Sequence, residues 1–210
     1  QQTGLGVEFT EVVIRLSQDT KVLALILTAI AGIILGMGLP TTPAYIVQVA
    51  LLVPALTKLG VQLEAAHLFA FYFAILSVIT PPVAISLYAA NGLSGAGLWE
   101  SGVAAVKLAA TGYIIPFMFV YGPSLMLIGT PVEIVLTSIT AIVGVICLAS
   151  SLHGYLLRQA MIHERLLLFA ASMTLITPGV FTDLAGFAML AVVAATQRVF
   201  KREAAVPSAE

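Results

Sequence analysis

The sequence is poor in charged residues. Only 9% of its 210 residues are Asp, Glu, Lys or Arg, whereas 60% are hydrophobic. No charged residue occurs between Lys21 and Lys58. This composition lies far outside the range of soluble globular domains. The scarcity of charge therefore excludes an ordinary soluble protein and predicts an integral membrane protein.

Cysteine and an excess of positive charge are also lacking. The single cysteine, Cys147, excludes an intrachain disulfide, and its apolar surroundings predict a packed thiol. A net charge of -1 provides no field that would attract nucleic acid, so no nucleic-acid partner is expected. No nucleophile lies beside a base and no metal-ligand spacing occurs. The sequence therefore predicts no organic cofactor and no enzyme.

Long apolar runs are present instead. The segments Leu68 to Ala90, Leu108 to Ile128 and Ile134 to Leu152 carry no charge. Each can cross a hydrocarbon core of about 30 Å, which takes roughly 20 helical residues. The sequence therefore predicts an all-α integral membrane fold.

The N-terminal segment alternates apolar and polar residues at helical spacing. The apolar residues of 8 to 20 recur on one side and the polar residues lie on the other. The apolar ones are Phe9, Val12, Val13 and Leu16, and the polar ones are Glu8, Glu11, Arg15, Gln18 and Asp19. Such a pattern is typical of a short helix at a membrane interface. We therefore expect an amphipathic helix there.

The segment 22–57 is too interrupted for a simple membrane span. "GMGLPTTPAY", residues 36 to 45, contains two glycines and two prolines. If 36–42 is not helical, the flanking helices Val22 to Leu35 and Pro43 to Leu56 each rise only about 21 Å. Neither crosses a bilayer, so we expect a re-entrant helical hairpin over 22–57.

Leu68 to Ala90 has the length of a span but contains adjacent prolines. They lie in "SVITPPVAIS", residues 77 to 86. Proline removes a backbone hydrogen bond and clashes with the preceding helical turn. Such a break is tolerated in a membrane only where protein or water surrounds it. We therefore expect a broken transmembrane helix over 68–90.

Two further features occur in the C-terminal half. Leu108 to Ile128 is expected to be one ordinary span, with Tyr113 and Tyr121 as interfacial anchors. Thr130, Pro131 and Glu133 predict a capping box that begins the span ending at Leu152.

The last apolar region, 166–196, is interrupted by "TPG" at residues 177 to 179. Its two halves look too short for two full spans. Arginine and lysine flank both ends, which the positive-inside rule assigns to the cytoplasm. We therefore expect this region to dip into the membrane and return. Asp183 near its turn is either a helix cap or a proton-relay carboxylate.

Both breaks have the same local design, in which a threonine precedes a proline. Thr42–Pro43 and Thr80–Pro81 are expected to be the N-cap and first residue of new half-helices. Helix N-termini favour an anion, and the free carbonyls of the helices that end there favour a cation such as sodium. The sequence therefore predicts a carboxylate and sodium site, with sodium held by backbone near Gly38 and Thr80. The candidate residues are Gly36, Gly38, Pro40, Thr41, Thr42, Pro43, Ser77, Thr80, Pro81, Pro82 and Val83.

Other polar side chains near the breaks have two interpretations. Gln48, Ser77, Ser86 and Asn91 either add ligands or form hydrogen bonds between packed helices. The pattern does not distinguish these interpretations.

Two longer strings carry a family resemblance. They are "IILGMGLPTTPAYIV" from Ile33 to Val47 and "AAHLFAFYFAILSVITPPVAISLYAANGLSGA" from Ala65 to Ala96. The chain resembles the large permease of TRAP transporters, and among these the fused permeases that work with TAXI-type substrate-binding proteins. The resemblance covers about residues 1 to 128.

The resemblance implies a sodium-driven secondary transporter of the elevator-type ion-transporter superfamily. Such a permease imports organic acids, delivered by a periplasmic binding protein, across a bacterial or archaeal inner (plasma) membrane. Residues 1–20 would be the arm helix and 21–98 part of the transport domain. Residues 99–128 would be a scaffold helix and 129–210 additional membrane helices and a tail, in contact with membrane lipid.

Such permeases contain two inverted repeats, each with a hairpin and a broken helix, and this chain has one full set. We therefore expect it to be the C-terminal half of a permease. Its partner would be the N-terminal remainder, including small-permease-like helices. Two alternatives remain: a structural or assembly subunit without its own solute site, and a membrane-embedded enzyme that uses Asp183 or His163.

Overall fold

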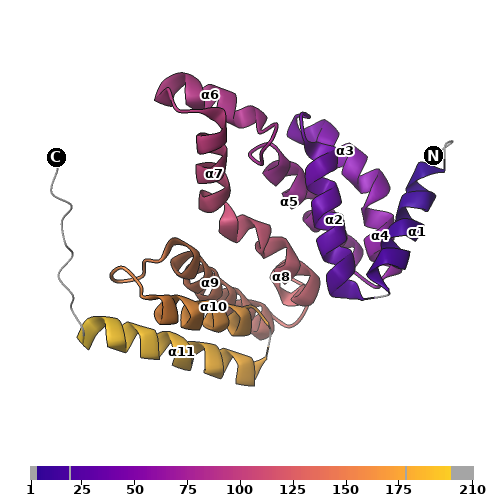
Figure 1. Ribbon diagram of the computed structural model, residues 1–210. Helices are drawn as coiled ribbons and strands as arrows, with labels where there is room; N and C mark the ends of the chain where they lie inside the picture. The colour runs from indigo at the N-terminus through magenta and orange to yellow at the C-terminus, as the bar shows by residue number, and fades with distance from the viewer. Residues whose placement is uncertain (1–3, 19, 178, 200–210) are drawn as a thin grey trace. The chain divides into compact units, whose positions relative to one another are not determined.

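The computed structural model of the chain describes residues 4–18, 20–177 and 179–199 (Figure 1). The described residues are mainly helical, and their β-structure is limited to one isolated bridge between Tyr155 and Gln159. This confirms the predicted all-α class. The chain divides into two compact units, Gln1–Leu127 and Ile128–Glu210.

Unit 1 consists of short helices. They are α1 (Leu5–Ser17), α2 (Lys21–Gly36), α3 (Thr41–Leu51), α4 (Val53–Lys58), α5 (Leu63–Ser77), α6 (Ile85–Ser94), α7 (Leu98–Leu108), the 3-10 turn η1 (Ala110–Tyr113), α8 (Ile115–Tyr121) and η2 (Pro123–Met126).

The apolar core of unit 1 is centred on α5. Phe69 and Phe73 of this helix are fully or almost fully buried, together with Leu25 of α2 and Leu56 of α4. Phe117 of α8 contacts both α5 phenylalanines, with ring centroids 5.3 and 6.3 Å away. Burying each such side chain contributes roughly 1.5 to 3 kcal/mol. This core holds α2, α4 and α8 against α5.

The helix expected near the N-terminus forms as α1, with acidic Glu8 in its first turn and Arg15 in its last. One face packs onto α2 and α4, where Val13, Ala24 and Ala55 form a small buried cluster. Val12 and Leu16 remain exposed beside the charged residues. The predicted helix is therefore present, but only Phe9 and Val13 of its predicted apolar side pack against unit 1.

Helices α2 and α3 form an antiparallel helical hairpin (Figure 1). The residues between them are 37–40, and Gln48 of α3 returns to Gly32 of α2. The prediction that Thr42 is an N-cap is wrong, because α3 begins at Thr41 after Pro40. Pro43 then lies at the third helical position, where its missing N–H still costs no helical hydrogen bond.

The second break lies between α5 and α6, over residues 78–84 (Figure 1). A broken helix is therefore present, but the prediction that Thr80 caps a helix beginning at Pro81 is wrong. α6 begins only at Ile85. The reason is steric, because Thr80 and Pro81 each precede a proline and are pushed away from helical backbone angles.

The prediction of one ordinary span from Leu108 to Ile128 is also wrong. Leu98–Leu108 and Ala110–Tyr121 are two helical pieces that bend by 65° at their junction. Gly112 lowers the helix propensity there, and Pro116 lies at the start of α8. A proline in the middle of the span would have broken the helix, whereas one at a helix start does not.

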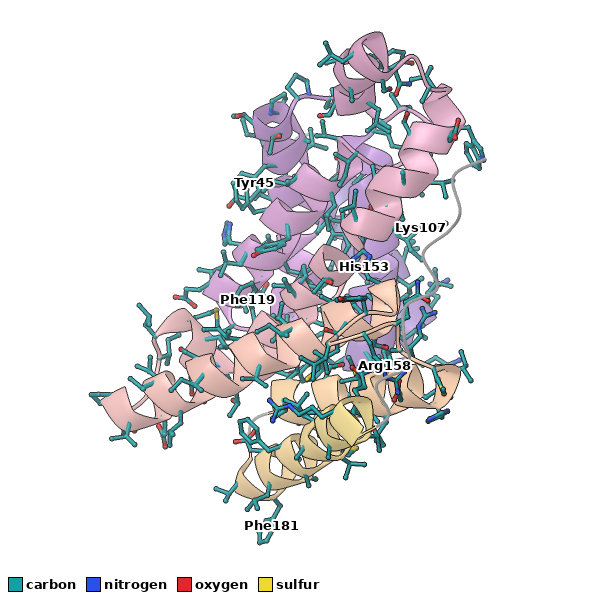
Figure 2. The ribbon with its side chains drawn as sticks, turned by 90° about the vertical axis from the view of Figure 1, so that its left-hand side faces the viewer. Tyr45, Lys107, Phe119, His153, Arg158 and Phe181 are labelled. Carbon is teal, nitrogen blue, oxygen red and sulfur yellow. The ribbon has the colours of Figure 1, made fainter. Side chains whose placement is uncertain are left out.

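The described part of unit 2 contains α9 (Pro131–His153), α10 (Ile162–Ile176) and α11 (Val180–Val199). The predicted capping box begins α9: the Glu133 N–H donates to Thr130 Oγ1, and the Thr130 N–H donates to Glu133 Oε2. This prediction is confirmed. Phe181 near the start of α11 is 89% exposed and points away from the helix (Figure 2).

Helix α10 packs against both α9 and α11, which scarcely touch each other (Figure 1). Glycines permit the close approach, because a Cβ at Gly144 of α9 would lie 3.2 Å from Leu175 Cβ. A Cβ at Gly186 of α11 would lie 2.9 Å from Leu175 Cδ2. Small residues at helix contacts are typical of membrane proteins.

Within the described residues, α9 and α11 are long and apolar enough to cross a membrane, and the bent pair around residue 109 would be a third span. The prediction that both halves of 166–196 are too short is wrong for α11. This helix extends past Thr196 to Val199, and the side chain of Gln197 within it is buried and hydrogen-bonded.

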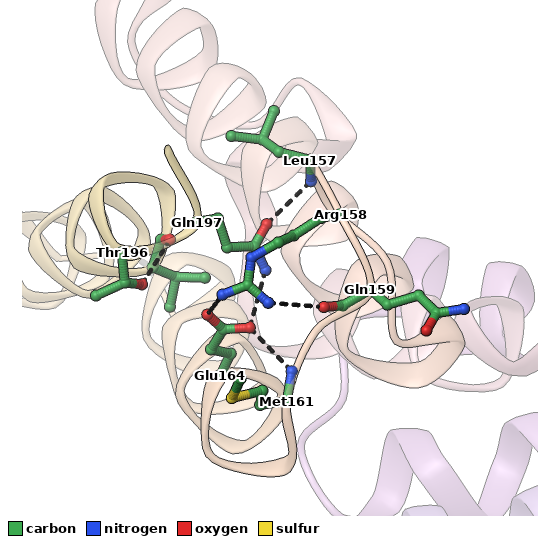
Figure 3. Close-up of polar contacts among 8 residues, drawn as sticks. Leu157, Arg158, Gln159, Met161, Glu164, Thr196 and Gln197 are labelled. Carbon is green, nitrogen blue, oxygen red and sulfur yellow. Dashed lines mark hydrogen bonds and ion pairs between the residues drawn. The ribbon is translucent and has the colours of Figure 1, made fainter. Parts of the chain in front are cut away.

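A buried polar cluster joins the 154–161 loop to α10 and α11 (Figure 3). Arg158 Nη2 donates to Glu164 Oε1 at 2.7 Å. Gln197 Nε2 and the Met161 N–H both donate to Glu164 Oε2. Burial by itself would raise the pKa of Glu164, but these donors and the Arg158 charge outweigh it and lower that pKa.

Candidate functional site

The hairpin tip and the α5–α6 break lie against each other. A Cβ added at Gly36, the last residue of α2, would lie 2.7 Å from Ser77 Cβ at the end of α5. One added at Gly38 in the tip would lie 3.8 Å from Val83 Cγ1 in the break. The structure therefore brings together four of the predicted site residues from two separate motifs.

One residue in each break has a left-handed backbone conformation. Gly38 has φ +80°, a left-handed conformation that favours glycine. Ala84, which directly precedes α6, has φ +40° although it carries a side chain. Strained backbone of this kind costs of order 1 to 3 kcal/mol and is concentrated at functional sites. The α5–α6 break therefore contains strained backbone at Ala84, whereas Gly38 adopts its turn without strain.

Gln48 anchors the hairpin from within. Its side chain is fully buried, and Nε2 donates to the Gly32 carbonyl at 2.8 Å. Cβ atoms at Gly32 and Gly36 would lie 3.1 and 3.0 Å from this amide. Its Oε1 has no hydrogen-bond partner among the described residues. Of the two interpretations of Gln48, the structure supports a hydrogen bond between helices.

The hydroxyl groups of Ser77 and Thr80 are both engaged by neighbouring protein groups. Ser77 Oγ donates to the Ala74 carbonyl at 2.7 Å. Thr80 Oγ1 lies 2.6 Å from the Leu76 carbonyl and 2.7 Å from the Tyr113 hydroxyl. With these partners, Ser77 and Thr80 shape the backbone of the break.

Backbone carbonyls are the groups left open for a ligand. Within the described part of the chain, no donor is found for the carbonyls of 37–39 or 79–83. The carbonyls of Leu76, Ser77 and Val78, in contrast, accept from Ile79, Thr80 and Ser86 respectively. Backbone carbonyl oxygens at helix interruptions suit an alkali cation.

The start of α3 offers less to an anion than the sequence predicts. Pro40 and Pro43 have no N–H, and the Ala44 N–H already donates to the Pro40 carbonyl at 3.1 Å. Thr41 and Thr42 therefore supply the two remaining N–H groups of this first turn. The geometry favours the cation half of the predicted site.

Four other candidate residues lie in the break or in the helix that follows it. With its amide oriented to satisfy its neighbours, Asn91 bonds to Ser101 and Leu87 and links α6 to α7. Pro81 contacts α7, where a Cβ at Gly102 would lie 2.6 Å from Pro81 Cγ. Pro82 and Ser86 are exposed. The structure therefore gives Asn91 and Pro81 packing contacts with α7.

Asp183 belongs to unit 2 and lies in the first turn of α11. Its Oδ1 is buried and has no partner among the described residues. Thr182 Oγ1 instead bonds to the Thr177 and Gly179 carbonyls at the α10–α11 turn. The expectation that the Asp183 side chain caps this turn is therefore wrong.

Two residues that contact the break were not predicted from the sequence. The sequence predicts Tyr113 to be an interfacial anchor, yet its hydroxyl reaches Thr80. Gly102 carries no motif at all, and its contact with Pro81 follows only from the packing of α7. Both residues follow the break by about 20 to 30 positions, so no local spacing rule identifies them.

Comparisons with known proteins agree with this architecture. Residues 1–134 match the family described as the Tripartite ATP-independent periplasmic transporter, DctM component. Residues 134–186 match a domain of unknown function, DUF3394. The two matches meet close to the boundary between the two units. No curated protein and no solved structure matches the chain.

The DctM match spans more than half of the chain and includes the hairpin and the broken helix. DctM proteins are membrane permease components of transporters and form no enzyme family. The chain belongs to the DctM family of TRAP transporter large permease components.

Proposed function

We propose that the hairpin tip and the α5–α6 break form one half of a sodium and carboxylate site. The chain would then supply the C-terminal half of a sodium-coupled permease that imports organic acids. One observation carries the proposal: two helix interruptions from separate motifs meet, and each leaves carbonyls without donors among the described residues. The family description adds that transport is independent of ATP, so another driving force is needed.

A sodium gradient is a driving force that this geometry can use. A cation bound between the tip and the break would neutralise the carbonyl dipoles on both sides. It would also add positive charge near the Thr41 and Thr42 N–H groups, where a carboxylate can bind. Sodium binding would thereby strengthen carboxylate binding and couple the two.

The remaining parts of the proposal follow from the family. The partner that delivers the solute would be a periplasmic TAXI-type binding protein, and an N-terminal permease portion with small-permease-like helices would complete the site. The protein would lie in a bacterial or archaeal inner membrane. The hairpin α2–α3 would be re-entrant and would move as part of an elevator-type transport domain.

The test is uptake into proteoliposomes that contain the complete permease, with its binding protein outside. A panel of radiolabelled mono- and dicarboxylates is offered with an inward sodium gradient, and potassium replaces sodium in the control. We expect uptake of at least one carboxylate to fall about tenfold or more without sodium. Uptake of the same size in potassium would contradict sodium coupling. No uptake of any carboxylate would favour the structural-subunit alternative.

A further inference from the structure

Two side contacts brace the α5–α6 break from α7 and η1. The first is the close approach of Gly102 in α7 to Pro81. The second is the hydrogen bond between the Tyr113 hydroxyl in η1 and Thr80 Oγ1, at 2.7 Å. Both contacts fall on neighbouring residues of the break. The segment 98–113 therefore holds two neighbouring residues of the break, Thr80 and Pro81.

The hydrogen-bond chain at Thr80 has one consistent direction. Thr80 Oγ1 has a single proton, and the nearby Leu76 carbonyl, 2.6 Å away, can only accept it. The Tyr113 hydroxyl must then donate to Thr80 Oγ1. This chain occupies the Leu76 carbonyl and fixes the Thr80 side chain. Residues 79–83, which follow directly, keep their carbonyls free of donors in the described structure.

We propose that Tyr113 is a positioning residue for the cation half of the site. It acts through Thr80 and contacts no ligand: its hydroxyl holds the break in the conformation that presents the 79–83 carbonyls. The inference rests on the proposed function for its effect on sodium affinity. The bracing of the break itself does not depend on which ligand binds.

The fold provides a matched control for Tyr113. Tyr121 ends α8, is 43% exposed, and makes no side-chain hydrogen bond among the described residues. Tyr113→Phe and Tyr121→Phe therefore remove the same atom from two tyrosines of one segment. Only the first removal disconnects a hydroxyl from the break.

The test is hydrogen exchange of the break amides in the complete permease, embedded in lipid nanodiscs. The Ser86 N–H, which donates to the Val78 carbonyl across the break, is the main reporter. In potassium, we expect Tyr113→Phe to speed its exchange about 3- to 10-fold, as loss of one hydrogen bond allows. Tyr121→Phe should leave it unchanged. Equal rates in wild type and Tyr113→Phe would overturn the inference.

Titration with sodium measures the sodium concentration that half-protects the break. A general destabilisation of the fold would not change this concentration. We expect the sodium concentration that half-protects the break to rise about 3- to 10-fold in Tyr113→Phe, with maximal protection retained. Thr80→Ala should have an equal or larger effect, and adding Tyr113→Phe to it should change nothing more. Additive effects would show that Tyr113 does not act through Thr80 and would overturn the inference.

The two proposals fail in different ways. If sodium protects the break of the wild-type protein no better than potassium, the proposed sodium site is wrong. The comparison of Tyr113→Phe with Tyr121→Phe in potassium then still tests whether the Tyr113 hydroxyl holds the break in place. If sodium protects both tyrosine variants with the wild-type midpoint, the sodium site stands and the positioning role of Tyr113 is wrong.

Discussion

The two units of this chain differ in the contacts made at their helix ends. In unit 1, α2 and α5 end in breaks whose carbonyls at 37–39 and 79–83 have no donor within the described residues. In unit 2, α9 begins with a capping box, and the loop that follows it is closed by the Arg158–Glu164 pair. Both units are apolar, so hydrophobicity does not explain the difference.

The difference follows from where glycine, proline and charge occur. Unit 1 has Gly36, Gly38, Pro81 and Pro82 inside its apolar runs, where they interrupt helices. In unit 2, charged groups such as Arg158 and Glu164 pair with each other at the loop between α9 and α10. Open backbone groups at membrane depth are costly unless they are used. The proposed site lies at the two breaks of unit 1.

The largest effect is expected from adding a side chain where the hairpin contacts the broken helix. In Gly36→Ala, the new Cβ would lie 2.7 Å from Ser77 Cβ, so α2 and α5 must separate. Overpacking of this kind costs about 1 to 3 kcal/mol, and we expect carboxylate uptake to fall at least about tenfold. Uptake into proteoliposomes measures it.

The control for this change is Gly92→Ala, because a Cβ at Gly92 meets nothing within 4 Å. That variant should transport like the wild type. Adding Ser77→Gly to Gly36→Ala removes the clashing atoms and should restore part of the uptake. Full activity of Gly36→Ala would show that the contact between tip and break is not needed.

A change in unit 2 should affect stability and leave ion specificity unchanged. Glu164→Gln leaves Arg158 without its buried partner, which we expect to destabilise unit 2 by about 3 kcal/mol. Thermal unfolding in detergent, followed by circular dichroism, measures the loss. Glu100→Gln, at an exposed position of α7, is the control. A change in sodium dependence of uptake in Glu164→Gln would contradict the separation of roles between the units.

The same pair predicts acid sensitivity. Because the pKa of Glu164 is lowered in the folded protein, the unfolded chain binds its proton first as the pH falls. Its contribution to stability is therefore complete above about pH 4.3, the ordinary glutamate value, and is lost as the pH drops through the lowered pKa. We expect wild type to lose more stability than Glu164→Gln below about pH 4.3. Parallel pH profiles would be the contrary result.

The smallest effect is expected at the capping box. Thr130→Ala removes the hydroxyl that accepts from the Glu133 N–H and should destabilise α9 by about 1 kcal/mol. Thr137→Ala in the same helix removes a hydroxyl without a hydrogen bond in the described structure. Thermal unfolding of the two variants should therefore differ, and equal midpoints would show that the box contributes nothing measurable.

Short-range chemistry was predictable from the sequence. The capping box at Thr130 depends on neighbours three residues apart, and the amphipathic pattern of α1 depends on helical spacing. The existence of both breaks also followed from Gly38, Pro81 and Pro82, whose backbone preferences are local. Such features depend on one segment alone.

Features that depend on a second segment were not predictable. The sequence predicts Thr80 to be an N-cap, whereas its hydroxyl contacts the Leu76 carbonyl and the Tyr113 hydroxyl. Gln197 of α11 pairs with Glu164, 33 residues away. The family resemblance assigns residues 99–128 to a scaffold helix. Phe117 of this segment packs on Phe69 of α5. The scaffold assignment stays a prediction, which cross-linking can test.

The hairpin tip and the break are proposed to form one cation site. Its most direct test is maleimide labelling of Val83→Cys in a Cys147→Ala background, with Leu93→Cys, at a position 94% exposed, as the control. Val83 faces Gly38 of the tip. We predict that sodium, but not potassium, slows labelling at residue 83 and leaves residue 93 unaffected. Equal labelling of residue 83 in both ions would contradict the claim.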